Sequence, residues 1–514
     1  MKRKVITILA SVSVGLIAIV TAVPISYSVN NHTNSNSGYD SDNDSNNFPN
    51  QNNSNNGSNQ NNIDPNWNSN WTPITYANKA NPINDGGGAH MFAKYDSRSN
   101  SLIPSVGPKG VTPSPGVPKN SGFSRNYLYN ETQVKQAKRT VGIGFIRGKG
   151  MGINSGTGWI LDYKLTQDSS SYPLTWYFAT NAHVIQNLRV KNDIITPERY
   201  ENIENSTYNT EQIKFTSLKD YSMNTNLDFS HEYTYLTPKL DSNGVSNIRT
   251  VMIGNDFLKT SPSYFSKYEK YQKFEEYADF AVMEVTFDDE QQARKVTNNY
   301  ADDKTNQFKY KKQSLLAHPE DIKPNNYSIV GFPAIDPIKN YAWSNIAVNR
   351  PENPTEEQKK ELSSLASTGF YNTYKDKVGV FDATIGLSFF TTTYSVQPTT
   401  FKEENFLPWG LLYPTDYSAL TQGSSGSMMM DKDGYTWGIH FLIDPDASVS
   451  FSQALYSEGF DYGGAFGKYN LEGYDLIDGG FINQKKSYRD GLIQLYGKDN
   501  SFKTNLYPNG VNRN

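Results

Sequence analysis

Three residues that are far apart in the chain could together carry out nucleophilic catalysis. Ser425 lies in a turn of small residues, and His183 directly follows an apolar run. Serine is a weak nucleophile until an adjacent base, most often histidine, takes its proton. A carboxylate must hold that histidine in one tautomer, and Asp279, at the start of a second apolar run, is the candidate. The three residue types therefore predict acyl transfer through an activated serine.

Flanking glycines select Ser425 among three neighbouring serines. Gly426 follows it and Gly423 lies two residues before it, whereas Ser424 and Ser427 lack this pattern. Glycine adopts the strained backbone of a tight turn at little steric cost. We expect the backbone N–H groups of Gly423 and Ser425 to form the oxyanion hole, which stabilises the negative charge that develops on the attacked carbonyl.

The order of the three residues along the chain is informative. His, Asp, Ser is the order of chymotrypsin-like enzymes, and it differs from the orders in subtilisins and in α/β-hydrolases. The spacings are wide, but long insertions between strands cost little because closure entropy grows only logarithmically with loop length. His440 and His231 stay open as rival bases, although His440 is close to Ser425 in sequence.

Strands must position these residues. Aromatic residues make up 13 % of the chain, with 35 tyrosines, which favours a mainly β fold. Capping and charge patterns predict helices over 130–138, 288–298 and 355–367, the last two as decorations of loops. The apolar runs that predict strands are 140–146, 155–161, 176–180, 277–285, 327–333 and 434–441.

Composition excludes several classes of function. The chain has no cysteine, which excludes disulfides, a cysteine nucleophile, thiolate metal sites and a lipid-modified N-terminal cysteine. Its six histidines are scattered and form no HExxH motif, so we expect neither a metal nor another cofactor. A net charge of −4 gives no reason to expect nucleic acid as a partner.

The first 28 residues read as a signal peptide or an N-terminal membrane anchor. Three basic residues, Lys2, Arg3 and Lys4, precede an apolar run over 5–25 that is close to the ~20 residues needed to span a bilayer. Both readings place the rest of the chain outside the cytoplasm, at the cell surface or secreted. Residues 29–85 are rich in Asn and Ser and predict a disordered linker. Residues 86–125 are rich in Pro and Gly and predict an irregular segment.

Several of these motifs resemble those of trypsin-like proteases. The run 180–184, with His183, is similar to their histidine motif, and Asp279-Phe280-Ala281-Val282 is similar to their aspartate motif. Gly423-Ser424-Ser425-Gly426-Ser427 resembles their Gly-Asp-Ser-Gly-Gly, with Ser424 in place of Asp. Gly331-Phe332-Pro333 resembles their Gly-Tyr-Pro. The resemblance implies a chymotrypsin/trypsin-like double β-barrel with helical and loop insertions, over 126–514.

The C-terminal part resembles a narrower group, the mycoplasma immunoglobulin-protease family of surface proteins. The motifs that carry this resemblance lie at 473–477, 487–489 and 504–510. The resemblance implies an exported serine endopeptidase that acts on host proteins, with immunoglobulin heavy chain as a candidate substrate. It also implies a separate antibody-binding surface protein as a partner. Many members carry a lipid-modified cysteine, and this chain has none.

Substrate preference and the rival functions stay open. By the trypsin-like resemblance, Trp437, Gly438 and Ile439 would line one wall of the substrate pocket, and Ala419 would lie near its base. No acidic residue is placed there, so no preference for Lys or Arg is expected. The main alternative is a catalytically inactive trypsin-like surface module that binds host protein such as immunoglobulin. A plain adhesin or scaffold is a third reading.

Overall fold

The fold is known from a computed structural model, and the residues that it describes belong to one compact unit, 62–514. The described residues are 91–96, 101–106, 128, 130–148, 153–168, 170–195, 208–223, 231–261, 264, 275–318, 321, 327–332, 347–348, 381–382, 392–394, 404–415, 420, 423–444, 449–461, 470–498 and 500–513. The predictions for 1–28, for 29–85, for the helix 355–367 and for Ala419 lie outside them.

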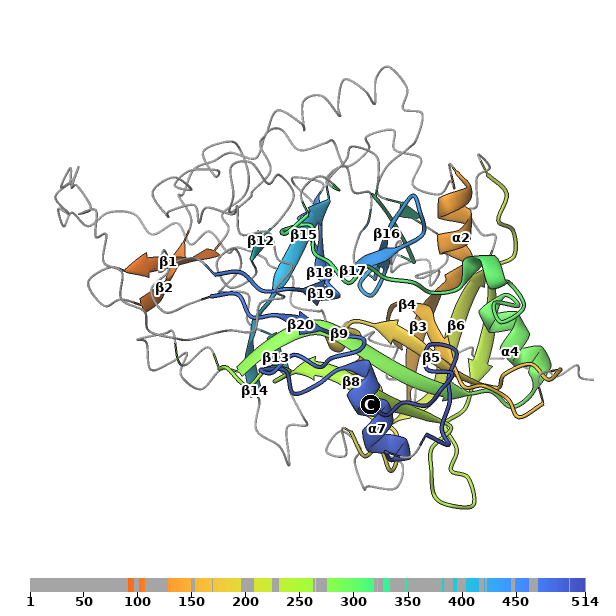
Figure 1. Cartoon of the computed structure of the whole chain (residues 1–514). Helices are drawn as coiled ribbons and strands as arrows, with labels where there is room; N and C mark the ends of the chain where they lie inside the picture. Colours follow the sequence, from red (N-terminus) through yellow and green to blue (C-terminus); the bar gives the residue numbers. More distant parts are fainter. Residues whose placement is uncertain are drawn as a thin grey trace, which may run out of the picture. The chain divides into compact units, whose positions relative to one another are not determined.

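The chain is mainly β, as predicted, and most of its strands belong to two large, largely antiparallel sheets (Figure 1). The first sheet has the order β13-β14-β9-β5-β4-β3-β6-β7, and β8 also pairs with β9. Its strands are β3 (Thr140–Arg147), β4 (Ile153–Tyr163), β5 (Thr175–Thr180), β6 (Thr210–Leu218), β7 (His231–Leu236), β8 (Ile248–Asn255), β9 (Glu275–Thr286), β13 (Thr392–Tyr394) and β14 (Glu404–Pro408).

The second sheet has the order β11-β10-β16-β17-β18-β15-β12. Its strands are β10 (Tyr327–Gly331), β11 (Ala347–Val348), β12 (Phe381–Asp382), β15 (Leu411–Thr415), β16 (Met428–Asp431), β17 (Thr436–Asp444) and β18 (Val449–Ala454). A short pair, β19 (Tyr456–Ser457) and β20 (Tyr474–Asp475), lies apart from it. Among the described residues, the outer strands of neither sheet pair with each other, so neither sheet closes into a barrel.

Strand β9 lies at the centre of the first sheet. Its sequence is apolar from Phe280 to Met283, and all of its residues except the first and last are buried. A strand that is covered on both faces requires such a continuous apolar run. It pairs with β5 in a register that sets Thr180 opposite Ala281. This pairing brings the end of β5, just before His183, next to Asp279.

Short helices cap the sheets. The N-cap residue of helix α2 (Glu131–Arg139) is Asn130, and that of α4 (Glu290–Thr297) is Asp289. Each N-cap side chain accepts a hydrogen bond from a backbone N–H of the first turn. Both helices confirm the predictions for 130–138 and 288–298. The others are α3 (Ala182–Ile185), the 3-10 turn η6 (Lys304–Asn306) and α7 (Tyr488–Tyr496).

Helix α2 joins the two sheets, because it leads directly into β3 and is bonded to the second sheet. The amide of Gln136 donates to the carbonyl oxygens of Ser328 on β10 and Met428 on β16, at 3.0 and 2.8 Å. The Ser328 hydroxyl donates a hydrogen bond to Gln136 Oε1 at 2.6 Å. Gln136 is completely buried, so these bonds also satisfy a side chain that would be costly to bury unpaired.

Two large clusters of buried side chains form the core. One lies within the first sheet and its helices and includes Val141, Ile143, Phe178, Phe215, Met283 and Val285. The other combines side chains of both sheets with the C-terminal segment and includes Trp159, Tyr177, Phe280, Met428, Ile439, Tyr474 and Tyr488. The second cluster ties the C-terminal residues to the strands that carry the candidate site.

The segment 86–125, predicted to be irregular, contains a pair of strands. Strands β1 (Met91–Asp96) and β2 (Ser101–Val106) form an antiparallel pair with Met91 opposite Val106. The prediction rested on the Pro and Gly content of the whole segment. Within the segment, two short runs contain aromatic and aliphatic residues, which favour strands, and these two runs pair with each other. The single proline in the pair, Pro104, is compatible with a strand at an edge.

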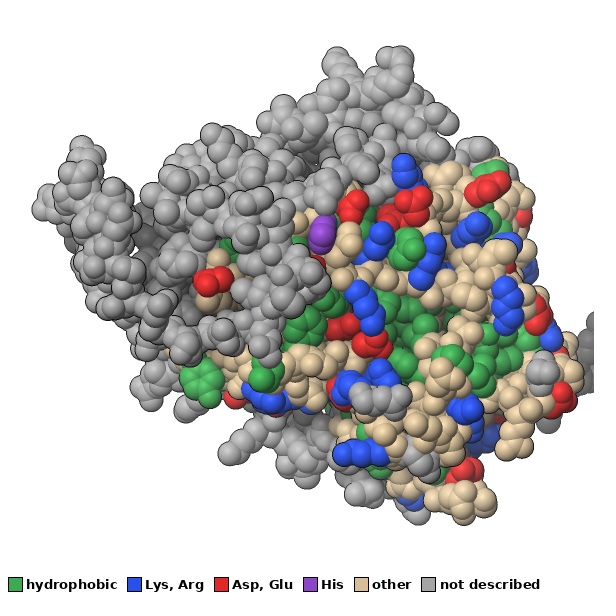
Figure 2. Space-filling model, in the orientation of Figure 1, with side chains coloured by type: hydrophobic (Ala, Val, Ile, Leu, Met, Phe, Trp, Pro, Cys, Tyr) green, Lys and Arg blue, Asp and Glu red, His purple; other side chains and the backbone are tan. Residues whose placement is uncertain are grey.

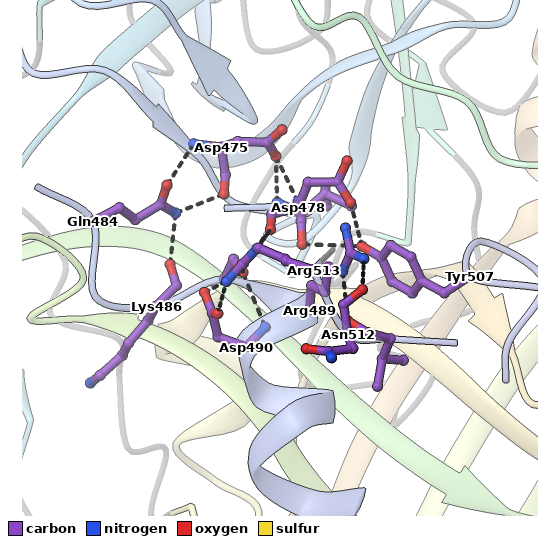
Figure 3. A network of polar contacts seen from close by, with 12 residues as sticks. Asp475, Asp478, Gln484, Lys486, Arg489, Asp490, Tyr507, Asn512 and Arg513 are labelled. Atoms are coloured by element: carbon purple, nitrogen blue, oxygen red, sulfur yellow. Dashed lines mark hydrogen bonds and ion pairs between the residues drawn. The ribbon is translucent and has the colours of Figure 1, made fainter. Parts of the chain in front are cut away.

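The C-terminal residues are held against α7 by a network of polar contacts (Figure 3). Arg489 donates to the carbonyl oxygens of Val511 and Asn512, and Arg513 forms an ion pair with Asp490. The Tyr507 hydroxyl donates to Asp478 Oδ1 at 2.7 Å. These contacts involve the motifs that carried the family resemblance, so those motifs build structure around α7.

None of the described helices combines the length and the apolar character required to cross a bilayer. Over the face shown in Figure 2, Lys and Arg side chains are interspersed with Asp and Glu. Several charged side chains of the described residues form ion pairs, such as Lys312 with Asp478 and Lys485 with Asp256.

Candidate active site

His183 and Asp279 lie in direct contact and are joined by two hydrogen bonds. His183 Nδ1 lies 2.6 Å from Asp279 Oδ2, and the backbone N–H of His183 donates to Oδ1 at 3.1 Å. The Asp279 side chain is almost completely buried, whereas 23 % of the His183 side chain is exposed. The contact to Nδ1 leaves Nε2 as the ring nitrogen available to a substrate or to a nucleophile.

The backbone around this pair explains its geometry. Asn181 follows β5 and begins the short helix α3, which turns His183 back toward β9. The Asn181 amide donates to the carbonyl oxygen of Asp279 at 2.5 Å, and Asn181 is completely buried. Asp279 is therefore held through both its carboxylate and its main chain. Asn181 lies within the histidine motif 180–184, but the sequence pattern assigns it no role.

Ser425 lies in a tight turn between two positive-φ glycines. Gly423 has φ +95° and Gly426 has φ +98°, both in a region that favours glycine. The N–H of Gly426 donates to the carbonyl oxygen of His440 at 2.8 Å. The Ser427 hydroxyl donates to the carbonyl oxygen of Ser424 at 2.6 Å. These bonds define the turn and leave the Ser425 side chain partly exposed.

The serine turn packs against strand β4, and β4 also lies close to Val184, the residue after His183. The backbone N–H of Thr157 on β4 donates to the Ser425 carbonyl oxygen at 2.7 Å. A Cβ added at Gly156 would lie 2.5 Å from Val184 Cγ2 and 3.1 Å from the same Ser425 oxygen. Gly156 thus lies between Val184 and the serine turn, and a side chain there would push them apart.

No hydrogen bond joins the Ser425 hydroxyl to the His183 ring, although both residues are described. Such bonds are often long in the absence of substrate and tighten only in the reacting complex, so the missing bond alone does not decide the roles of the two residues. The structure therefore brings His183 and Asp279 into contact. It also places the serine turn beside β4, the strand that lies close to Val184. The catalytic roles of the three residues remain a prediction.

The two rival histidines lie in different settings. His231 begins β7, an outer strand that β4, β3 and β6 separate from β5. His440 is 2 % exposed, and its backbone pairs with Ser427. Burial, followed by the charge of nearby His183, lowers the pKa of His440 to about 3. Its ring is therefore neutral near pH 7 and is too poorly basic to replace His183.

The residues expected to line a substrate pocket are buried in the second sheet. The Trp437 indole N–H donates to Asp431 Oδ2 at 2.8 Å, and the ring packs edge-on against Tyr327. Ile439 is completely buried in the larger core cluster. A Cβ at Gly438 would lie 2.7 Å from the Gln453 carbonyl oxygen. Their role in substrate binding remains a prediction.

One group of carboxylates lies close to β9. Ligand atoms of Asp256, Glu275 and Glu276 lie within 4.8 Å of one another. The ammonium of Lys485 is 2.5 Å from Asp256 Oδ1 and already supplies positive charge. Burial raises the pKa of Glu276 to about 8, and its Oε1 accepts the N–H of Leu258 at 2.6 Å. Glu276 is therefore mostly protonated at neutral pH.

The raised pKa of Glu276 predicts a loss of stability as the pH rises. Folding favours the protonated form, because the pKa of this group is about 8 when folded and near its ordinary value of 4.5 when unfolded. The stabilisation is complete below about pH 4.5 and declines toward pH 8, with a slope of at most about 1.4 kcal/mol per pH unit. Burial also raises the pKa of Asp162 to about 7 and that of Asp475 to about 6, so the contribution of Glu276 is read as the difference between variants. In urea unfolding at several pH values, Glu276→Gln should reduce the slope by up to about 1.4 kcal/mol per pH unit, and the exposed-site control Glu211→Gln should leave it unchanged.

The described site belongs to a mainly antiparallel β protein, in which a partly exposed histidine contacts a buried aspartate and a serine lies in a glycine-bounded turn. A solved structure described as "Structure of the mycoplasma MIB and MIP proteins" has this fold, with a TM-score of 0.54 and 21 % identity over 70 % of this chain and 60 % of that chain. The family model of the mycoplasma immunoglobulin protease matches residues 130–442, more than half of the chain. The chain therefore belongs to this family.

Two further similarities complete the comparison. A protein of Ureaplasma parvum serovar 3 named "Membrane-associated lipoprotein" is 25 % identical over 79 % of this chain, and the chain spans 57 % of that protein's length. The crystal structure of the Rv3671c protease from M. tuberculosis gives a TM-score of 0.25 and 10 % identity over 63 % of this chain and 79 % of that chain. The latter similarity is too low to carry an argument.

Proposed function

We propose that the protein is a serine endopeptidase that hydrolyses peptide bonds through a covalent acyl-enzyme. His183 is the base, Asp279 orients it, and Ser425 is the nucleophile. The observation that carries the proposal is the His183–Asp279 pair, in which both carboxylate oxygens bond the same residue. A binding protein has no evident need for a buried carboxylate that fixes one histidine tautomer beside a serine turn.

The proposed reaction uses groups that the site already holds. The Ser425 Oγ attacks the scissile carbonyl carbon, and its proton passes to His183 Nε2. The imidazolium, stabilised by Asp279, then gives the proton to the leaving amine. The N–H groups of Gly423 and Ser425 bind the developing oxyanion; removing one such donor typically costs on the order of 10²–10³ in rate. Water then cleaves the acyl-enzyme by the same proton transfers.

The proposed fold is a modified chymotrypsin/trypsin-like pair of β domains. Three features support it: the order His–Asp–Ser, the placement of His183 after a strand, and the hairpin β16–β17 directly after the serine turn. In activated zymogens of that type, an aspartate before the serine pairs with a new N-terminus. Ser424 occupies this position, and its buried hydroxyl has no hydrogen-bond partner among the described residues. A mechanism that needs no such activation is consistent with this change.

The proposed substrates are proteins of the host, immunoglobulin heavy chain first among them. The family supports this choice, as does the fold shared with a structure that includes mycoplasma MIB and MIP proteins. A separate antibody-binding surface protein is then the proposed partner. The relative named "Membrane-associated lipoprotein" supports a location at the cell surface. Because the chain has no cysteine, we propose an N-terminal helix anchor or secretion in place of a lipid anchor.

A fluorophosphonate probe, which reacts with activated serines, tests the proposal. Wild type is expected to be labelled, and Ser425→Ala to lose all labelling, because no other serine in the part of the chain that the structure describes lies in this setting. Ser424→Ala is a matched control that removes a neighbouring hydroxyl, and it should keep the label. Incubation with immunoglobulin, followed by gel electrophoresis, tests the substrate. Labelling that persists in Ser425→Ala would refute the assignment of the nucleophile.

The alternative is an inactive module of the same fold that binds immunoglobulin. The absence of a hydrogen bond between the described Ser425 and His183 side chains is the observation that favours it. A wild type that binds immunoglobulin, is not labelled and leaves the heavy chain intact would support this alternative.

A further inference from the structure

Thr157 contacts the serine turn at two points. Its backbone N–H donates to the Ser425 carbonyl oxygen at 2.7 Å, and its Oγ1 donates to the Gly423 carbonyl oxygen at 3.0 Å. Thr157 is completely buried on β4, a strand of the first sheet. The turn belongs to the second sheet through β16. One threonine therefore spans the residues on which the proposed oxyanion donors lie.

The neighbours of Thr157 determine the direction of its hydroxyl proton. The backbone N–H of Phe332 donates to Thr157 Oγ1 at 3.0 Å and occupies one of its lone pairs. The single hydroxyl proton is then directed at the Gly423 oxygen. The Thr180 hydroxyl donates to the Thr157 carbonyl oxygen at 2.7 Å. Thr180 ends β5, three residues before His183, so the same threonine also connects the turn to the strand that carries the histidine.

Gly423 needs this support more than another residue would. Glycine at φ +95° has many accessible backbone conformations, so the peptide group between Gly423 and Ser424 can rotate unless a bond holds it. A peptide group is planar, with its C=O and N–H on opposite sides. The carbonyl oxygen of Ser424 accepts the Ser427 hydroxyl inside the turn. Because the Ser425 N–H lies on the opposite side of the same peptide group, it points away from the body of the turn. Among the described residues, nothing accepts the N–H of Gly423 or of Ser425.

We infer that Thr157 is a positioning residue for the oxyanion hole. Its hydroxyl holds the Gly423–Ser424 peptide group, which links the two peptide groups that carry the N–H donors of Gly423 and Ser425. In this orientation both donors point toward the proposed position of the oxyanion. This inference rests on the proposed function, and it adds a residue to which the triad pattern assigns no role. Thr157 does not touch the reacting atoms. It acts through the turn.

Fluorophosphonate kinetics separate this role from a merely structural one. Thr157→Val has nearly the same shape but no hydroxyl. We expect its maximal labelling rate to fall about 10- to 100-fold, part of the 10²–10³ cost of losing one oxyanion donor. The probe concentration for half-maximal rate should not change, and neither should the midpoint of the pH profile, because the His183–Asp279 pair is untouched. Thr157→Ser restores the hydroxyl and should restore the rate.

The controls keep each outcome interpretable. Thr297→Val removes another completely buried threonine hydroxyl, bonded to Tyr172 and far from the turn in sequence, and should leave the labelling rate unchanged. If Thr157→Val does not fold, as judged by its melting temperature, Thr157→Cys takes its place. Its thiol is a weak donor, so an intermediate rate is expected.

Two results would overturn the inference while leaving the proposed function intact: a wild-type rate in a folded variant without the Thr157 hydroxyl, or a Thr157→Ser variant as slow as Thr157→Val. By contrast, a wild type that shows no Ser425-dependent labelling would overturn the proposed function and the inference with it.

Discussion

Replacing Asp279 by asparagine is expected to slow the reaction of Ser425 about 10⁴-fold, the size of the effect of this change in trypsin-type proteases. The variant keeps the shape of the side chain and removes its charge. Because both hydrogen-bond partners of the Asp279 carboxylate belong to His183, the structure predicts how the new amide group will be oriented, and that orientation explains the loss.

The backbone N–H of His183 needs an acceptor, which is now Asp279 Oδ1. The carbonyl oxygen of the asparagine will take this position, and its NH₂ group will face His183 Nδ1. Since NH₂ only donates, Nδ1 must present its lone pair, and the ring proton moves to Nε2. Nε2 then cannot accept the proton of Ser425.

The second-order rate of fluorophosphonate labelling at neutral pH measures this effect. His231→Ala is the control, because this rival base lies on the outer strand β7 and its loss should not change the rate. A melting temperature close to that of wild type would show that Asp279→Asn folds. An Asp279→Asn variant that reacts nearly as fast as wild type would show that Asp279 does not set the tautomer of His183.

Local patterns were sufficient to predict β5, which ends just before His183, and β9, which carries Asp279, but not the short helix α3 on which His183 lies. The apolar run after Asp279 is long and continuous, as a strand buried on both faces requires. The caps Asn130 and Asp289 began the two helices where expected. The sequence also predicted that Asp279 is the partner of His183, because it is the single Asp at the start of an apolar run that lies between the candidate base and the candidate nucleophile.

The contacts between sheets could not be predicted in this way. Thr157 is one threonine in a run of small residues, and its importance depends on the register that sets its hydroxyl opposite Gly423, 266 residues away. Similarly, nothing near Glu276 in the sequence indicates that its carboxyl group is buried beside Asp256. Local periodicity carries no information on such long-range pairings. The open ends of both sheets were missed for the same reason, since closure depends on pairing between distant strands.

Gly426→Ala is expected to destabilise the protein by about 3 kcal/mol or more, because strain and overpacking act at the same atom. Its φ of +98° disfavours any residue with a Cβ. An added Cβ would lie 1.9 Å from the Thr157 carbonyl oxygen and 2.7 Å from Thr180 Oγ1. Neither atom can move without breaking the bond between Thr157 and Thr180.

Gly434→Ala separates the two contributions. Gly434 has φ +83°, but its nearest neighbour would be the flexible Lys309 side chain at 3.4 Å. Only the backbone strain applies there, so a loss of about 1–2 kcal/mol is expected. Urea unfolding measures both variants. Since Gly426 follows Ser425 directly, a shift of the turn by about 1 Å should also lower the labelling rate about 100-fold, whereas Gly434→Ala should react like wild type. Equal losses of stability in the two variants would show that the close approach of the turn to β4 is not what requires glycine at position 426.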